Sequence, residues 1–441
     1  MTARIAKYAL ILIGLAVAGC GGSQTDQDPS KQKNKTETPK RISSLVAQQW
    51  KRAGAERVWL VTNKKGELTV SSGATPKLFT LEVFLFRKKG KAETLAKLPV
   101  PDAPFGVVFS GERWTDDALK QLPACDSLRY LALIHTKVTD AGMKRLPEQE
   151  NLNYLNLSGC KNITIAGLRE IPKLSKLKYL TVAQRPITLD DVKVIGRLKS
   201  LRYLNLDSTN LSDEGLNELA DLKSLTHLYL REANVTGTGL KVLAGMNKLQ
   251  RLYLSHNSMT DDVLRTLRQQ KQLHVWSLAS RADDHLPGSD EEVTSFVLTN
   301  AQVTDKGLQE LAPMKNLQTL WLKNLNVTGP GLTVLKNFPN LKMLKLNYSK
   351  VTDEGLNHLA SLNKLERLEL SRTLITNDGL KEIVKLKTLQ HLDLSRTKVT
   401  YAGLKQLVQL RHLKVLQLVG VPLSRDDRKA FKQAMPGCAI H

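Results

Sequence analysis

Cysteine is scarce in this chain. Four cysteines stand in 441 residues, which excludes a fold held together by a dense disulfide framework. They form no C-x-x-C pair, and no pair of histidines completes a zinc signature, so we expect no metal or other cofactor. For Cys125, Cys160 and Cys438 we expect buried free thiols.

Catalytic signatures are also missing. The sequence has no G-x-S-x-G elbow and no glycine-rich phosphate-binding loop, and no motif places a histidine, serine or cysteine as a nucleophile or base. We therefore expect a protein that is not an enzyme.

Acidic residues are outnumbered by basic ones. The 42 aspartates and glutamates face 65 lysines and arginines, which gives a net charge of +23. Such a field attracts polyanions. No RNA- or DNA-binding motif accompanies the charge, so nucleic acid is an unlikely partner, and anionic lipid or acidic polymer fits better.

What the chain has in abundance is periodic leucine. Leu201, Leu204 and Leu206 recur 24 residues later and again after another 24. This period is typical of a solenoid, in which stacked units bury one continuous core. Weaker units hold the same frame at Pro104, Val107 and Phe109 and at Val293, Phe296 and Leu298. The other strong units begin at Leu128, Leu152, Leu177, Leu317, Leu341, Leu365, Leu389 and Leu413.

Each unit contains a strand and a helix start. The L-x-x-L-x-L segment places leucines on one side of a strand, so positions three, five and seven point to the other side. The motif V-T-D-E-G-L follows at Val351–Leu356, where Thr352 is suited to cap a helix and Asp353 suits its positive end.

These units resemble leucine-rich repeats, and Cys160 at position nine is similar to the cysteine-containing, ribonuclease-inhibitor-like subclass found in F-box adaptor proteins. Thr209, Thr373 and Thr397 replace that cysteine elsewhere, and no F-box precedes the repeats. The resemblance implies a right-handed α/β solenoid over residues 104–441, a curved horseshoe with parallel strands on the concave side and helices on the convex side. It also implies a role in binding.

The N-terminus predicts a lipid anchor. Arg4 and Lys7 precede a short apolar run that ends in "VAGC" at Cys20, which marks residues 1–20 as a signal peptide. The resemblance to a bacterial lipobox implies that Cys20 is lipidated and that the protein lies in the cell envelope. Gly21 in the next position favours the outer over the inner membrane. Residues 21–43 lack large apolar side chains and are expected to form a disordered tether.

Residues 44–103 differ from the repeats. "LVAQQWKRAG" predicts a helix, while "RVWLVTNKKGELTV" and "TLEVFLF" predict strands, the first broken by a turn at Asn63–Gly66. Repeat arrays need their ends covered, so this segment is interpreted as a small α+β cap. An independent ligand-binding domain is the alternative.

One unit, residues 273–292, is irregular. Its second half has no helix signal and gathers Asp283, Asp284, Asp290, Glu291 and Glu292 around His285. A solvated connector is the favoured interpretation. A metal site lacking the ligand order of an EF-hand and a partner-contact loop are the alternatives.

Aromatic residues on the strands predict the binding surface. Position three holds tyrosine in four successive units, and position five then takes over; basic residues precede three of the tyrosines. Exposed tyrosines with basic neighbours suit an acidic protein or glycan partner, whereas the alternative is an aromatic ladder that only stabilises the sheet. The candidate partner-binding residues are Tyr130, Tyr154, Tyr179, Tyr203, Tyr229, Tyr253, Trp321, Arg129, Lys178 and Arg202.

The sequence thus predicts a lipid-anchored, non-enzymatic solenoid that binds a partner through its concave face. The alternative is a structural or adhesive protein whose basic convex face contacts anionic lipid or polymer. Lysines that fall on the predicted helices support the alternative: Lys144, Lys193, Lys241, Lys336, Lys381 and Lys405.

Overall fold

The computed structural model describes residues 41–62, 68–72, 81–87, 89–283 and 285–441. Cys20, the tether up to residue 40, the predicted turn at 63–66 and Asp284 lie outside the described residues. The chain forms two compact units, called the first and the second unit, and each contains several of the 24-residue repeats. The first runs to Ala233 and adds Gly245–Leu249; the second comprises Asn234–Ala244 and Gln250–His441.

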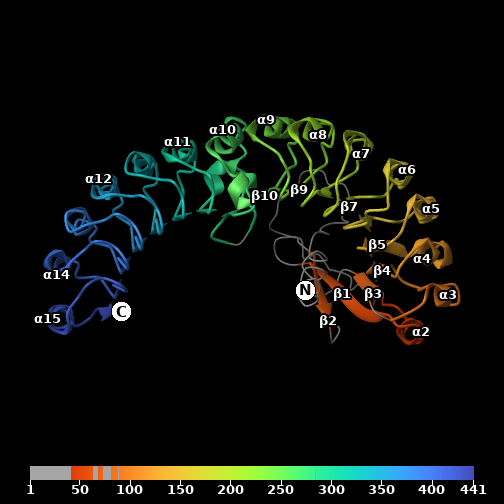
Figure 1. Cartoon of the computed structure of the whole chain (residues 1–441), viewed down its shortest axis with the longest axis horizontal. Helices are drawn as coiled ribbons and strands as arrows, with labels where there is room; N and C mark the ends of the chain where they lie inside the picture. Colours follow the sequence, from red (N-terminus) through yellow and green to blue (C-terminus); the bar gives the residue numbers. More distant parts are fainter. Residues whose placement is uncertain (1–40, 63–67, 73–80, 88, 284) are drawn as a thin grey trace, which may run out of the picture. The chain divides into compact units, whose positions relative to one another are not determined.

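The first unit is built on a mixed sheet (Figure 1). Strand β1 pairs antiparallel with β2 and β3, and from β3 to β9 every pairing is parallel. The strands are β1 (Glu56–Thr62), β2 (Leu68–Ser72), β3 (Leu81–Phe86), β4 (Phe105–Ser110), β5 (Leu128–Ile134), β6 (Tyr154–Asn156), β7 (Tyr179–Thr181), β8 (Tyr203–Asn205) and β9 (His227–Leu230). The helices are α2 (Ser44–Arg52), α3 (Ala92–Leu95), α4 (Asp116–Gln121), α5 (Asp140–Met143), η1 (Leu146–Glu148), α6 (Ile165–Leu168), η2 (Ile171–Lys173), α7 (Leu189–Ile195) and α8 (Asp213–Asn217).

In the second unit, β11 pairs antiparallel with β12, and the sheet is parallel from β12 to β18. Its strands are β10 (Arg251–Leu254), β11 (Ala279–Ser280), β12 (Ser295–Thr299), β13 (Thr319–Lys323), β14 (Met343–Lys345), β15 (Arg367–Glu369), β16 (His391–Asp393), β17 (Val415–Gln417) and β18 (Ala439–Ile440). Its helices are α9 (Gly237–Leu240), η3 (Lys241–Gly245), η4 (His256–Ser258), α10 (Asp261–Gln269), η5 (Leu273–Val275), η6 (Asp290–Glu292), α11 (Asp305–Leu308), η7 (Gln309–Leu311), η8 (Pro330–Asn337), α12 (Asp353–Leu356), η9 (Asn357–Leu359), α13 (Leu380–Ile383), α14 (Tyr401–Leu404), η10 (Lys405–Gln409) and α15 (Arg425–Ala434). Among the described residues, every helix is too short or too polar to cross a bilayer.

The predicted helix and strands of the cap are confirmed. The indole of Trp50 on α2 stacks on the ring of Phe84 at 4.5 Å between ring centroids, and Phe105 of β4 meets it edge-on at 5.6 Å. Since β4 pairs with β3 on one side and β5 on the other, the cap sheet continues into the sheet of the repeats.

The leucine frame is confirmed as the core. Leu201, Leu204 and Leu206 are fully buried, as are their equivalents in the other strong units, with few exceptions above 1% exposure. The weak unit at Pro104 needs a correction. A register shift between Phe105 and the next residue of β4 places Phe105 opposite Leu128, so Phe105, and not the exposed Pro104, fills the first core position.

Position nine closes the turn after each strand. The hydroxyl of Thr209 donates a hydrogen bond to the carbonyl of Leu206 at 2.7 Å, and Thr373 and Thr397 do the same within their own units at 2.6 Å. The thiol of Cys160 donates to the carbonyl of Leu133, one unit earlier, at 2.9 Å. Hydroxyl groups thus satisfy a turn carbonyl where the resembled subclass has cysteine.

Adjacent units are joined by aspartate at the helix starts. Asp140 accepts hydrogen bonds from the backbone N–H and the hydroxyl of Thr164 in the next unit, at 2.7 and 2.6 Å, and from the backbone N–H of Gly167 at 3.0 Å. One carboxylate therefore binds three donors at the start of the following helix. The same aspartate-to-threonine contact recurs between Asp116 and Thr139, Asp261 and Thr304, Asp305 and Thr328, and Asp353 and Thr376.

The glycine of the T-D-x-G-L motif leaves room for that aspartate. A Cβ atom on Gly167 would lie 2.4 Å from Oδ1 of Asp140, and one on Gly142 would lie 2.4 Å from Oδ1 of Asp116. Both distances are far below van der Waals contact. Threonine, aspartate and glycine thus form one interlocking contact between repeats.

The predicted role of Thr352 is only partly correct. Thr352 is the N-cap residue of α12, but its side chain makes no capping hydrogen bond. The preceding unit has Gly329 where other units have aspartate, so no carboxylate reaches Thr352 from that side. Asp353 lies in the first turn of α12, as predicted, and its carboxylate also binds the threonine of the following repeat.

The interlock predicts a non-additive pair of substitutions. Asp116→Ala removes two hydrogen bonds to Thr139 and should lower the free energy of unfolding by about 1–3 kcal/mol. Gly142→Ala should also destabilise the chain, because its Cβ meets the Asp116 carboxylate. In the double variant the clash is relieved. Its loss of unfolding free energy should therefore be smaller than the sum of the losses of the two single variants, by a coupling of about 0.5–3 kcal/mol.

The measurement is chemical denaturation of the wild type, the two single variants and the double variant. Gly437→Ala is the control, since no atom lies within 4 Å of a Cβ built there. Strict additivity of Asp116→Ala and Gly142→Ala would contradict the interlock.

Candidate functional site

The four predicted tyrosines form one row. The rings of Tyr130, Tyr154, Tyr179 and Tyr203 stack across β5 to β8, with centroid separations of 4.2, 6.0 and 4.6 Å. The row continues to His227 of β9, whose imidazole stacks on Tyr203 at 4.1 Å. His227 holds the same position of its unit, and the search for tyrosine alone missed it.

The rings are more buried than predicted. Each of the four tyrosines is at most 6% exposed, because stacked neighbours cover the faces of the inner rings. Burial raises the pKa of Tyr130 well above its usual value and also raises the pKa of Tyr154. The expectation of exposed rings is therefore wrong in this structure, and a direct role in partner binding stays a prediction.

The remaining predicted residues of the first unit hold other positions of their repeats. Arg129 donates hydrogen bonds to the carbonyls of Asp126 and Leu128, so its guanidinium lies along the backbone at the start of β5. Lys178 and Arg202 are half-buried at the starts of their strands. Tyr229 is buried in the neighbouring column, with Arg231 5.9 Å over its ring.

An acidic side chain lies at the end of β8. Asp207 is 8% exposed and accepts a hydrogen bond from the backbone N–H of Arg231 at 2.7 Å. Burial raises the pKa of Asp207 to about 6, although the nearby charge of Arg231 acts in the opposite direction. This carboxyl therefore titrates near neutral pH.

The strands of the second unit are more open. Trp321, Lys323, Lys345, Tyr348 and Arg372 form what we call the aromatic–basic cluster. The Nζ atom of Lys345 lies 4.2 Å from the centroid of the Trp321 ring. Lys323 and Arg372 lie 5.6 and 5.0 Å from the centroid of Tyr348. Trp321 is half-buried and Tyr348 is 45% exposed, so cation–π pairs face solvent here.

Backbone geometry fixes the outer members of the cluster. Tyr348 and Arg372 adopt left-handed backbone angles, with φ of 62° and 55°, at position eight of their units. Position eight is left-handed in most of the other repeats as well, from His135 to Gly420, with His256 as an exception. Side chains at this position therefore leave the strand end in a constant direction, a feature that the leucine pattern did not reveal.

Tyr253 and Trp321, the other predicted aromatics, belong to the second unit and lie in different places. Tyr253 is buried on β10, whereas Trp321 lies on β13 within the cluster. The indole N–H of Trp321 has no acceptor among the described residues. The cluster thus retains an unused donor on the ring that Lys345 contacts.

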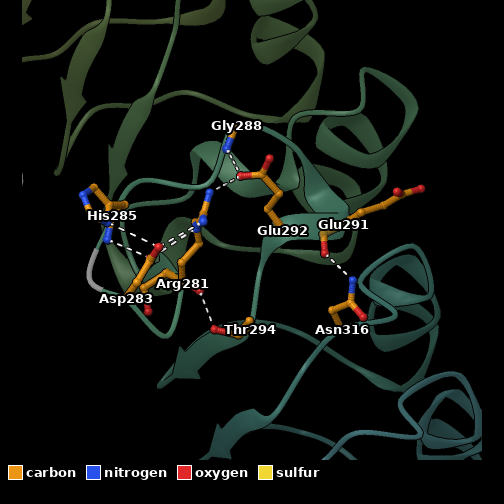
Figure 2. Close-up of polar contacts among 9 residues, drawn as sticks. Arg281, Asp283, His285, Gly288, Glu291, Glu292, Thr294 and Asn316 are labelled. Carbon is orange, nitrogen blue, oxygen red and sulfur yellow. Dashed lines mark hydrogen bonds and ion pairs between the residues drawn. The ribbon is translucent and has the colours of Figure 1, made fainter. Parts of the chain in front are cut away.

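The acidic loop of the irregular unit is internally paired (Figure 2). The guanidinium of Arg281 binds Asp283 at 3.0 Å and Glu292 at 2.8 Å, and Glu292 also accepts from the backbone N–H of Gly288. Asp290 is buried at the start of η6 and accepts from the backbone and ring of His274 at 2.8 Å. These carboxylates are occupied by arginine, histidine and backbone donors, which favours the connector interpretation.

No group of three potential metal ligands comes together in the part of the chain that the structure describes. Cys125, Cys160 and Cys438 are free thiols; Cys160 and Cys438 are buried as predicted, whereas Cys125 is only half-buried. The convex lysines named above are all exposed.

Comparison with known families shows to which family the chain belongs. A family model described as a leucine-rich repeat region matches residues 112–347, more than half of the chain, and a second leucine-rich repeat model matches residues 385–408. The chain belongs to the leucine-rich repeat family. Leucine-rich repeats generally mediate protein binding, and the fold is typically a non-enzymatic scaffold.

Solved structures of leucine-rich repeat proteins resemble the chain. A leucine-rich repeat protein of Leptospira interrogans has a TM-score of 0.52 and 21% identity, over 79% of this chain and 91% of the other. An internalin of Listeria monocytogenes has a TM-score of 0.41 and 17% identity, over 80% of this chain and 89% of its own. The first likeness supports the solenoid fold. Among curated proteins none matches the chain.

Asp207 predicts a pH-dependent stability. Its folded pKa of about 6 exceeds the ordinary 3.8, so the folded chain holds this proton more tightly than the unfolded chain. The stabilisation is complete below about pH 4 and is lost as pH rises through about 6. Relative to Asp207→Asn, the wild type should lose about 2 kcal/mol of unfolding free energy between pH 4 and pH 7.

Denaturation curves of both chains across this pH range measure the difference. Asp221→Asn is the matched control in the same repeat. Lys199 holds the pKa of this exposed carboxyl below its usual value, so the stabilisation from Asp221 is lost as pH falls, which is the opposite direction. A wild-type-minus-Asp207→Asn difference that does not change with pH would show that Asp207 is ionised throughout.

Proposed function

We propose that this leucine-rich repeat protein is a non-enzymatic, lipid-anchored protein of the bacterial cell envelope that binds an acidic protein partner. The observation that carries the binding claim is the aromatic–basic cluster on the strands of the second unit. It combines a half-buried ring, Trp321, and an exposed ring, Tyr348, with cations held over them.

The chemistry of the cluster supports an acidic partner. Lys323 and Arg372 are exposed, and Lys345 shares the carboxylate of Glu369 with Arg367, at 3.1 and 3.0 Å. One internal carboxylate thus faces several cations, which leaves positive charge for a partner to neutralise. Aromatic and arginine side chains are also the residues that most often dominate the energy of protein interfaces. An acidic glycan would meet the same chemistry and remains the second form of partner.

The sequence of the N-terminus supports the proposed location in the cell envelope. The lipobox at Cys20 and the polar residues 21–43 fit an anchored, tethered protein, and Gly21 favours the outer membrane. The alternative function, adhesion of the convex face to anionic lipid or polymer, is favoured by the exposed convex lysines.

The anchor is tested by Cys20→Ser. Without the thiol no lipid can be attached, so the variant should leave the membrane fraction of a bacterial expression host while the wild type stays in it. Fractionation after a high-salt wash, followed by immunoblotting, measures the distribution. Continued membrane association of Cys20→Ser would contradict the proposed anchor.

The concave site is tested by Lys323→Gln with Lys345→Gln, which removes both lysines stacked on the aromatic rings. Loss of two charge-assisted contacts should weaken binding of the acidic partner at least about tenfold, or about 1.4 kcal/mol. The melting temperature should change by only a few degrees, since Glu369 keeps its contact with Arg367. Affinity capture from envelope extract, quantified at constant ionic strength, provides the measurement.

Lys381→Gln with Lys385→Gln is the matched control. It removes the same charge from exposed lysines of the α13 region and leaves the strands untouched. If this control loses the partner and the cluster variant keeps it, the convex-face alternative replaces the concave-face proposal.

A further inference from the structure

A pocket opens in the N-terminal cap, which belongs to the first compact unit. It lies between α2 and β1 and has a volume of about 950 Å³. Pockets of roughly 300–1,000 Å³ are the size that holds small molecules. In the repeats, by contrast, buried leucines fill the space between helix and strand.

Cations line the pocket. Lys51 of α2, Arg57 of β1, and Arg87 and Lys89 after β3 all contribute to its wall. Glu56 is the acidic residue of the lining, and its carboxylate lies 4.0 Å from Arg87. Even after Glu82 beneath Arg57 is counted, positive charge is in excess.

Arg57 is fixed in place. Its Nε donates to the carboxylate of Glu82, which is only 1% exposed. Its guanidinium carbon lies 5.4 Å from the centroid of the Trp59 ring. An arginine held on two sides keeps its remaining N–H groups in a constant position, which suits recognition of a carboxylate or phosphate.

Trp59 adds an unused donor and an apolar surface. It lines the pocket, is 4% exposed, and its indole N–H has no acceptor among the described residues. Buried indole N–H groups usually find a partner. A ligand that carries an acceptor would satisfy the indole, and Ala47 and Ala55 continue the apolar lining beside it.

We propose that this pocket binds a small organic anion, a phosphate or carboxylate group attached to an apolar body. The cations and the indole N–H recognise the anionic group, and the Trp59 ring and the alanines contact the body. This site is separate from partner binding on the strands, and neither depends on the other.

The test uses 1-naphthyl phosphate as the probe, titrated calorimetrically into the full-length protein. Inorganic phosphate presents the anionic group alone, and 1-naphthol presents the apolar body alone. We expect one 1-naphthyl phosphate per chain, bound at least about tenfold more tightly than either fragment. Equal binding of 1-naphthol would overturn the proposal, because it would show a merely apolar site.

Lys51→Gln with Arg87→Gln should weaken 1-naphthyl phosphate at least tenfold, while Lys381→Gln with Lys385→Gln, of equal charge change, should leave it unaltered. Trp59→Phe should weaken the probe without lowering the melting temperature by more than a few degrees, since the indole N–H donates no hydrogen bond to any of the described residues. Equal affinity of the Lys51/Arg87 variant and the wild type would exclude this pocket as the site.

Two further titrations identify the source of the anion. Glycerol phosphate that displaces the probe indicates a soluble ligand. Displacement by phosphatidylglycerol vesicles and not by glycerol phosphate indicates a lipid headgroup that brings its own acyl chains. Failure of the naphthyl probe with intact folding of all variants overturns the pocket proposal and leaves the strand-face proposal standing.

Discussion

The contact between an aspartate and the threonine and glycine of the next repeat is the constraint on which the stack depends. Asp140 binds the backbone N–H and hydroxyl of Thr164, and only glycine at position 167 leaves space for the carboxylate. Where this contact is made, it fixes where a helix starts relative to the one before, and the strands of the joined repeats pair in register, as with Leu131 opposite Leu155. Equivalent side chains of paired strands form columns, and the tyrosine row is one of them.

The sequence predicted the period, the buried leucines and the elements of the cap, because each depends on local alternation of apolar and polar residues. It assigned the T-D-x-G-L motif to helix capping within one repeat. The partner of Asp140 lies in a different repeat, and no single repeat contains that information. The column of Tyr203 was likewise predicted from tyrosine alone. The prediction therefore missed His227, whose ring stacks in the same column.

The exposure of side chains on the strand face could not be predicted from the alternation of apolar and polar residues. Alternation indicates on which side of the sheet a side chain lies, but not whether neighbouring side chains cover it. Flat rings in successive units stack and exclude solvent from one another, as in the row from Tyr130 to Tyr203. In the second unit the same column holds Met343, Arg367 and His391, whose shapes do not form a continuous stack. Those strands remain half-exposed. Repeats with the same leucine pattern therefore have buried side chains on the strand face of the first unit and exposed ones on that of the second.

The cap shares one feature with several repeats, which is buried polar groups without a partner in the described part of the chain. Around β1, Glu82 is buried with one oxygen unpaired among the described residues, and Trp59 keeps an unsatisfied N–H, as Trp321 does in the repeats. Such groups cost stability that an apolar side chain would not. Violations of packing rules are expected at functional sites, and in the cap Trp59 and Arg57, the partner of Glu82, line a cationic pocket. A segment whose only task was to cover the end of the sheet would need neither the buried glutamate nor the pocket above it.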